Sequence, residues 1–265
     1  MNIWIQRSIE LANNKNYLDK LFDVYPMIPN KIRKIDESYW DSIVQAFNNK
    51  DDICLIKYLL YLDLFPIKDS YIPFLRRDTA NALKNNPETV KRLCNRLYKM
   101  GLNKIREKCT EPKETNRQIG PLFKKWCKNS FDKTKLLSVT DFEKTNEKTN
   151  ENAILDATDK EMMDWAFRTV NYKRNKGLDF AGRFNGKYLI GEAKFLSDFG
   201  GHQDAQLEDA VLTLTAPNVK ATKIAILDGV CWLKTNNKMY KAITEEYCEE
   251  NIMSALLLKD FIKSL

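Results

Sequence analysis

The residues with the clearest potential for chemistry are Asp179, Glu192 and Lys194, which flank the dipeptide 185–186, Asn-Gly. Asn-Gly is the preferred centre of a two-residue β-hairpin turn, because both turn positions require positive φ. A turn at these residues places Asp179 directly across from Glu192. Side chains alternate along a strand, so Lys194 projects from the same face as Glu192.

This hairpin is expected to have one charged face and one apolar face. Alternation places seven residues on the charged face: Asp179, Ala181, Arg183, Tyr188, Ile190, Glu192 and Lys194. The opposite face carries Leu178, Phe180, Gly182, Phe184, Leu189, Gly191, Ala193 and Phe195. We expect the second face to rest on a hydrophobic core.

Two carboxylates opposed on neighbouring strands repel each other unless positive charge lies between them. Mg²⁺ suits such a pair, because it takes oxygen ligands from one or two carboxylates and completes its shell with water and phosphate oxygens. Lys194 would then hold or help to deprotonate a water while the metal polarises a phosphoryl group. The alternative interpretation is a surface salt-bridge patch in which Lys194 only neutralises the pair.

Composition describes a soluble globular protein of 265 residues, with 43% hydrophobic and 30% charged residues, organised as one large or two smaller domains. It has no apolar run of about 18 residues that would span a membrane, and its N-terminus lacks a signal-peptide layout. The six cysteines show no CxxC spacing, and a single histidine argues against a zinc site. Scattered thiols without a secretion signal predict a cytoplasmic protein.

Positive charge is concentrated in one segment. Residues 76–135 contain 17 Lys and Arg against six Asp and Glu, an excess of 11. The formal net charge of the chain is +7, so the remainder carries −4. This asymmetry favours a polyanionic partner, with nucleic acid ahead of a membrane surface. On charge alone, a solvated helix face is an equally good explanation.

Residues up to about 112 show mainly helical spacing. Asn86-Pro87-Glu88 is typical of a helix start, and Gly101 of the end of that helix. Basic side chains line one side of this helix: Arg92, Arg96 and Lys99. A short helix over 78–84 before it gives a helix-turn-helix-like arrangement, although ordinary helix packing with a basic outer surface is the favoured interpretation.

Three further segments link this part to the hairpin. Gly120-Pro121 predicts a helix start with Lys124 and Lys125 facing outward, and the polar segment 143–152 predicts an exposed loop. Thr158-Asp-Lys-Glu161 matches a capping box at the start of another helix. Glu161 is therefore expected to be a capping residue, and the alternative is that it supplies another metal ligand.

Beyond Lys194, a loop over 195–203 precedes a helix predicted to reach about residue 214. His202, Gln203 and Gln206 lie just past the acidic pair, where glutamine could contact bases of DNA; unremarkable surface positions are the alternative. Further along, the sequence predicts a buried strand over 222–228, a hairpin around 236–237 and a terminal helix over 252–265.

The order of helix, hairpin with D-x12-E-x-K, helix and strand resembles the core of the PD-(D/E)xK nuclease superfamily. Within it, Gly120-Pro-Leu-Phe-Lys-Lys-Trp126 and Phe199-Gly-Gly-His-Gln203 resemble type II restriction endonucleases. The resemblance is strongest over residues 120–214. One departure is Leu178, which stands where the motif has its proline.

This resemblance implies an α/β fold of the α+β kind, with a central mixed sheet flanked by helices behind a helical N-terminal region. It implies that Asp179 and Glu192 bind Mg²⁺, that the Ala193 carbonyl is an additional ligand, and that Lys194 positions or activates the attacking water. The products would carry 5′-phosphate and 3′-hydroxyl ends. A cognate DNA methyltransferase is expected in the same restriction–modification system.

The sequence therefore predicts a Mg²⁺-dependent, sequence-specific endonuclease acting on double-stranded DNA. Residues 1–112 would serve recognition or dimerisation, and residues 113–265 would form the nuclease core. Cutting both strands of a palindromic site requires two active sites, so a homodimer is expected. The alternatives are a repair or junction-resolving nuclease with the same core, and a DNA-binding regulator without catalysis.

Overall fold

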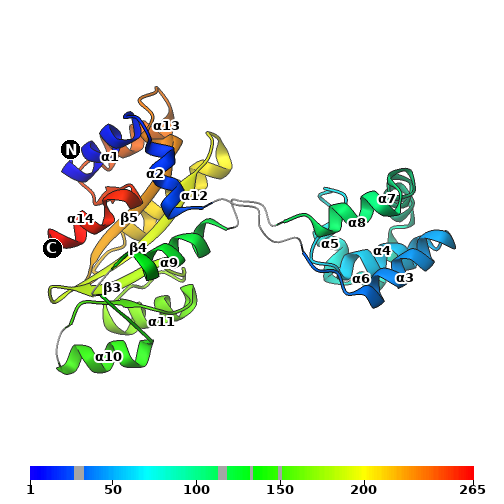
Figure 1. Cartoon of the computed structure of the whole chain (residues 1–265), viewed down its shortest axis with the longest axis horizontal. Coiled ribbons are helices and arrows are strands. Elements are labelled where there is room, and N and C mark those ends of the chain that lie inside the picture. Colours follow the sequence, from blue (N-terminus) through cyan, green and yellow to red (C-terminus); the bar gives the residue numbers. More distant parts are fainter. Residues whose placement is uncertain (27–32, 113–117, 132–133, 149–150) are drawn as a thin grey trace. The chain divides into compact units, whose positions relative to one another are not determined.

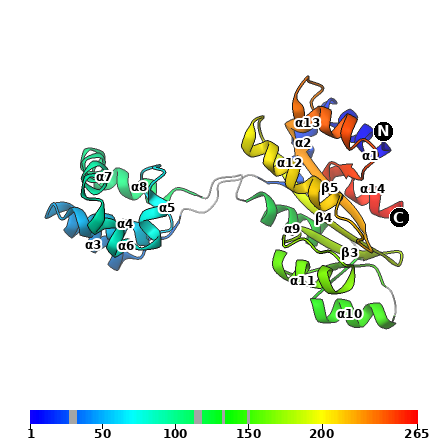
Figure 2. The same cartoon turned by 180° about the vertical axis from the view of Figure 1, so that it is seen from behind.

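The computed structural model describes residues 1–26, 33–112, 118–131, 134–148 and 151–265, which belong to two compact units (Figures 1 and 2). One unit contains a six-stranded sheet and comprises Met1–Met27 and Thr115–Leu265. The other, Ile28–Glu114, is helical. The expected α/β class with a central mixed sheet is confirmed. The described residues form no helix with the length and apolar character of a membrane span.

The division between the units differs from the predicted one at the N-terminus. The helices α1 (Ile3–Ala12) and α2 (Tyr17–Val24) belong to the sheet unit, whereas the sequence pattern predicts them in the helical region. Long-range hydrogen bonds explain the difference: the Ser254 backbone N–H donates to Ser8 Oγ at 2.9 Å. The predicted boundary at 112/113 adjoins residues 113–117, which lie outside the described residues.

The helical unit is built from α3 (Glu37–Asn48), α4 (Asp52–Tyr61), α5 (Ile72–Arg77), α6 (Thr79–Asn85), α7 (Pro87–Met100) and α8 (Leu102–Thr110). The predicted helix after Asn86 is confirmed: α7 begins at Pro87 and ends before Gly101, whose φ is +77°. Its apolar stripe, including Leu93 and Leu97, is fully buried in the core of this unit. The opposite side of α7 keeps its basic side chains exposed.

The sheet contains β1 (Lys135–Leu137), β2 (Ala153–Leu155), β3 (Phe180–Phe184), β4 (Lys187–Leu196), β5 (Thr222–Gly229) and β6 (Ile252–Met253), in that spatial order. The pairs β2–β3 and β3–β4 are antiparallel, and the other pairs are parallel. The buried strand predicted over 222–228 is β5. Together β4 and β5 form the long centre of the sheet and support the hairpin.

The predicted apolar face of the hairpin does rest on a core. Phe180 packs against Phe123 of α9 (Ile119–Ser130), with ring centroids 6.4 Å apart. Phe184 contacts Phe131 at the end of the same helix. Leu178 is an exception. It lies before the start of β3, and its side chain is buried in the core on the other side of the sheet. Helices α2 and α9 lie over this face in Figure 1.

The opposite face of the hairpin is covered as well, which the sequence pattern does not predict. Ala181 and Ile190 are buried against Trp165 of α11 (Asp159–Thr169). Arg183 is also buried and donates to the carbonyl oxygens of Glu151 and Phe142, at 2.8 and 3.1 Å. The charged face is therefore interior over most of its length. On this face, α12 (Gly201–Leu214) covers strands β4 and β5, as Figure 2 shows.

Three local predictions are corrected. Much of the segment predicted as a loop over 143–152 lies in α10 (Val139–Lys148), because buried Phe142 anchors that helix against Trp165; residues 149–150 lie outside the described ranges. The predicted hairpin around 236–237 is wrong: Asn237 caps α13 (Lys238–Lys241), and a π-helical turn follows over Ala242–Glu246. The predicted terminal helix is split into β6, a 3-10 turn over Ala255–Leu257 and α14 (Leu258–Lys263).

A buried carboxylate ties these peripheral elements to the sheet. Asp228, near the end of β5, accepts hydrogen bonds from the Tyr17 and Tyr25 hydroxyls, both at 3.0 Å, and from Ser254 Oγ at 2.5 Å and the Ala255 N–H at 3.2 Å. Burial raises the pKa of Asp228 to about 6, although the four donors oppose this shift. One side chain thus joins α2, β5 and the C-terminal segment.

We expect Asp228→Ala to destabilise the sheet unit strongly. It leaves three buried hydroxyls without their acceptor, and each unsatisfied buried group costs about 1–3 kcal/mol. The measurement is the free energy of unfolding from urea denaturation. Asp260→Ala is the control, because the Asp260–Arg7 pair is half-exposed and such pairs contribute about 0–1 kcal/mol. Equal losses for the two variants would contradict the role given to Asp228.

Candidate active site

The predicted hairpin turn and register are both confirmed. Asn185 and Gly186 have φ of +50° and +77°, and the ladder pairs Phe184 with Lys187 through to Phe180 with Gly191. The Asp179 backbone N–H donates to the Gly191 carbonyl at 3.2 Å, which continues the same register to the residue before the start of β3. Asp179 therefore reaches the position across from Glu192.

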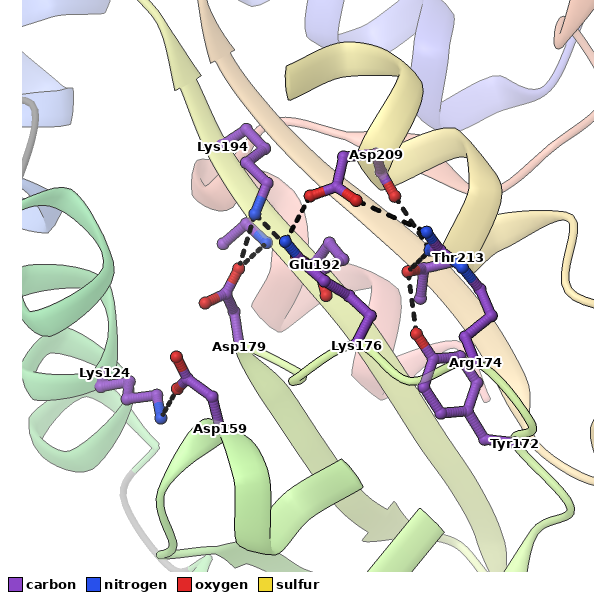
Figure 3. Close-up of polar contacts among 11 residues, drawn as sticks. Lys124, Asp159, Tyr172, Arg174, Lys176, Asp179, Glu192, Lys194, Asp209 and Thr213 are labelled. Atoms are coloured by element: carbon purple, nitrogen blue, oxygen red, sulfur yellow. Dashed lines mark hydrogen bonds and ion pairs between the residues drawn. The ribbon is translucent and has the colours of Figure 1, made fainter. Parts of the chain in front are cut away.

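Lys194 lies between the two acidic side chains (Figure 3). Its Nζ is 2.7 Å from Glu192 Oε2 and 3.2 Å from Asp179 Oδ2. The Ala193 backbone N–H also donates to Asp179 Oδ2, at 3.0 Å. The Glu192 side chain is 1% exposed, against 14% for Asp179 and 16% for Lys194. The group does form the ion pairs of the alternative interpretation, but its members are largely removed from solvent and do not form a surface patch.

The electrostatics of the group follow from this burial. Desolvation and then the charge of Asp179 raise the pKa of Glu192 to about 8, while Lys194 opposes the rise. Burial by itself lowers the pKa of Lys194, but the two carboxylates outweigh it and the net shift is upward. Glu192 Oε1 is buried and has no hydrogen-bond partner within the described ranges. The site therefore holds excess negative charge only when both acids are ionised, and one of its carboxylate oxygens has no partner among the described residues.

A close approach between two segments sets the position of Asp179. A Cβ on Gly177 would lie 2.7 Å from Asp159 Cβ, so only glycine fits there without displacing a neighbour. The next residue, Leu178, donates its N–H to the Asp159 carbonyl at 3.2 Å. The first turn of α11 thus holds the chain immediately before the acid.

Two open hollows meet at the acidic pair. One, of about 430 Å³, is lined by Asp179, Glu192 and Lys194 together with the loop at 175–177 and the start of α11. The other, of about 310 Å³, is lined by Asp179 and Lys194, the start of α9 and two residues of α12, Gln206 and Asp209. Both hollows therefore reach Asp179 and Lys194, whereas only the first also reaches Glu192.

Glu161 is a capping residue, as the favoured interpretation predicts. Thr158 donates to Glu161 Oε2 from its backbone N–H at 2.8 Å and from its hydroxyl at 2.7 Å. No group of three His, Cys, Asp or Glu side chains in the described ranges is arranged to hold a metal ion, so Glu161 is not grouped with the acidic pair. It lines a separate hollow with Lys124 and Lys125.

The other predicted contact residues are dispersed. Lys124 is paired with Asp159, and Lys125 lies on α9 beside the hollow that Glu161 lines. At the start of α12, His202 and Gln206 contact each other at 3.1 Å, whereas Gln203 is buried and donates to Ser197 Oγ at 3.2 Å.

The basic residues of α7 belong to the helical unit. Lys99 is exposed, and Arg92 and Arg96 both face Asp69, at 2.6 and 3.6 Å. The hydrogen bond from Arg92 lowers the pKa of Asp69. This carboxylate is largely buried and offsets part of the positive charge of α7.

Two residues of the second hollow were not predicted from the sequence. Lys176, in the loop before β3, and Asp209, on α12, form an ion pair of 2.5 Å beside Asp179 and Lys194 (Figure 3). A signal for Lys176 was available, because a basic residue three positions before the first acid is bound to lie near it. Asp209 carried none, since its position depends on how α12 packs.

Comparison with known families adds evidence that is independent of this geometry. The family model described as the Tsp45I type II restriction enzyme matches residues 2–265. No curated protein and no solved structure matches the chain.

The raised pKa of Glu192 predicts a pH-dependent stability in metal-free buffer. Between pH 4.5 and about 8 the folded protein binds the extra proton, so the free energy of unfolding should fall as pH rises, by at most about 1.4 kcal/mol per pH unit. Urea denaturation at pH 5 and pH 8 measures this slope. Glu192→Gln cannot ionise and should show a shallower decline; parallel slopes for the two proteins would contradict the prediction.

Proposed function

The chain belongs to the Tsp45I type II restriction enzyme family, and from this membership we propose a Mg²⁺-dependent, sequence-specific hydrolysis of double-stranded DNA at the Asp179–Glu192–Lys194 site. The observation that carries the proposal is the pairing of two largely buried carboxylates with one lysine at the meeting point of two open hollows. Family membership favours a restriction endonuclease over the repair nuclease and the regulator considered from the sequence.

The donor set fits Mg²⁺. Glu192 Oε1 lacks a partner among the described residues, and Asp179 lies beside it across the hairpin. The Ala193 carbonyl would add a third oxygen. Mg²⁺ commonly takes one or two carboxylates and leaves its other positions to water and phosphate, which suits a site where the described residues place no third acid in position to hold the ion. When bound, the metal supplies Lewis-acid polarisation of the phosphodiester.

Asp179, Glu192 and Lys194 would then have different roles in the reaction. Asp179 and Glu192 hold the cation, which relieves the repulsion that contributes to the raised pKa of Glu192. Lys194, released from neutralising the carboxylates, orients the attacking water and stabilises the charge that develops on the phosphoryl oxygens. The water oxygen forms a new bond to phosphorus as the bond to the 3′ oxygen breaks; the water loses one proton and the 3′ oxygen gains one, which leaves 5′-phosphate and 3′-hydroxyl ends.

Recognition of DNA is proposed to involve both units. In the sheet unit, the candidates at the surface are Lys125, His202 and Gln206. Lys124 already forms an ion pair with Asp159, and Gln203 is buried and would need to move in order to contact DNA. In the helical unit, Arg92, Arg96 and Lys99 present positive charge to phosphates. We further propose a homodimer, because two strands require two sites, and a methyltransferase of matching specificity.

Digestion of a sequenced plasmid tests the function directly. The purified protein with Mg²⁺ should yield discrete fragments whose ends map to one short sequence and carry 5′-phosphates, and a chelator should abolish cutting. Preference for branched or damaged DNA would instead indicate a repair-type nuclease. Binding of duplex DNA without any Mg²⁺-dependent cutting would contradict the proposal.

Substitutions at the site should separate chemistry from folding. Asp179→Ala and Glu192→Ala should reduce the cleavage rate by about 10³-fold or more, since each removes a metal ligand. Lys194→Ala should lose about 10²–10⁴-fold. Single-turnover rates measure the loss, and thermal unfolding checks that each variant is folded. Glu246→Ala, an exposed acid away from the site, is the control; comparable losses there would remove the assignment.

The basic face of α7 gives a separate prediction about binding. Replacing Arg92 and Arg96 by Ala should weaken duplex binding and reduce the dependence of log affinity on log salt by about 0.9 for each phosphate that is no longer neutralised. Fluorescence anisotropy at several salt concentrations measures this slope. Lys104→Ala is the control, because Lys104 is an exposed basic residue on α8 and not on the basic side of α7. An unchanged slope in the double variant would place DNA elsewhere.

A further inference from the structure

The loop between α11 and β3, residues 171–179, is fastened on two sides as it approaches the acidic pair. At its end, the Gly177–Leu178 backbone rests against Asp159 at the start of α11. At its beginning, the Tyr172 hydroxyl contacts Thr213 Oγ1 of α12 at 3.1 Å. An irregular segment held this way keeps its side chains in defined positions without belonging to a strand or helix.

Arg174 adds a second connection to α12 (Figure 3). Its Nη1 donates to Thr213 Oγ1 at 2.6 Å and to the Asp209 carbonyl at 3.2 Å, and its Nη2 lies 3.4 Å from Asp209 Oδ1. Asp209 is thereby held by a neighbour that is three-quarters buried. Its second oxygen, Oδ2, remains directed to Lys176, at 2.5 Å from Nζ.

Lys176 is placed at the mouth of the site by this arrangement. It lines both hollows that meet at the acidic pair, and it shares them with Asp179 and Lys194. Its side chain is 41% exposed, so the ammonium group can reach a molecule that enters either hollow. Lys173, three residues earlier in the same loop, instead stacks over the Phe167 ring at 3.9 Å and lines neither hollow.

We propose that Lys176 binds a non-bridging oxygen of the DNA phosphate that occupies the active site, and that Asp209 is the positioning residue that aims it. This inference rests on the proposed function and names a further substrate-binding residue for it. Without a bound cation and with both acids ionised, Asp179, Glu192 and Lys194 together carry one negative charge, which opposes a phosphodiester. Lys176 would attract this phosphate. Because Asp209 already holds the lysine side chain in place, little further side-chain entropy would be lost when the phosphate binds.

Asp209 is better suited to aiming Lys176 than to binding metal, because its two oxygens are engaged by Arg174 and Lys176. Burial by itself raises the pKa of Asp209, but the neighbouring cations, Lys176 foremost, outweigh it and the net shift is downward. An approaching phosphate can share the ammonium with Asp209, because a lysine has three N–H donors. Lys176 therefore need not leave its partner in order to contact substrate.

The first test compares single-turnover cleavage of a synthetic duplex containing the mapped site. Lys176→Gln should slow cleavage about 10- to 100-fold, Lys176→Arg should recover part of the loss, and Asp209→Asn should lose less than Lys176→Gln. In the Lys176→Gln background, Asp209→Asn should cause little further loss, since its effect passes through Lys176. Lys173→Gln is the matched control from the same loop and should cleave at the wild-type rate.

The second test measures binding to phosphate without cleavage. In an Asp179→Ala background, Lys176→Gln should weaken binding of the duplex and reduce the slope of log affinity against log salt by about 0.9, the value for a single phosphate. With an uncharged methylphosphonate in place of the scissile phosphate, the proteins with and without Lys176→Gln should bind equally well. An affinity difference that survives this replacement would place Lys176 on another part of the DNA.

The outcomes distinguish a failure of this inference from a failure of the proposed function. Absence of any Mg²⁺-dependent cutting by the wild-type protein would refute the proposed function. Normal cutting that is lost in Asp179→Ala but unchanged in Lys176→Gln, together with an unchanged salt slope, would overturn only the role of Lys176. Equal losses in Lys176→Gln and Lys173→Gln would also overturn it, because they would trace to the loop and not to the ammonium group.

Discussion

Two carboxylates on adjoining strands, almost removed from solvent, repel each other, and a cation must lie between them for both to remain charged. Asp179 and Glu192 stand in this relation, and Lys194 is the cation that the chain itself provides. One ammonium group cannot balance two carboxylates, and the pKa of Glu192 rises to about 8 through its burial and this imbalance. The same imbalance that costs stability would favour the binding of a divalent cation. Fold and chemistry therefore depend on one electrostatic arrangement.

The rest of the sheet unit serves to hold that arrangement in place. The Asn-Gly turn fixes the register from one end of the hairpin, and the first turn of α11 fixes the other end through Gly177 and Asp159. Helices cover both faces of the hairpin, so the acids lie at the edge of a packed interior and not on an open surface. On β5, Asp228 joins α2 and the C-terminal segment to the same sheet. Packed elements thus support the site from both faces of the sheet.

Charge is divided between the two units in a way that suits an enzyme acting on DNA. The sheet unit concentrates acidic groups where a metal and a phosphate would meet, while the helical unit presents the basic side of α7. Asp69 restrains Arg92 and Arg96 without cancelling them, because one carboxylate faces two guanidinium groups. A similar arrangement recurs in the sheet unit, where Asp209 orients Lys176 beside the acidic pair. In both places a partly buried acid contacts basic side chains for which we propose an anionic partner.

Local sequence was enough to predict the hairpin, its register and the grouping of three residues at its open end, because turn preference and side-chain alternation are properties of neighbouring residues. The capping role of Glu161 and the limits of α7 could be predicted for the same reason. Three other features became visible only in the folded chain. Residues 1–26 belong to the sheet unit, helices cover both faces of the hairpin, and Asp209 lies beside Lys176. These features depend on contacts between residues far apart in the chain, and composition and periodicity carry no information about which distant segments will meet.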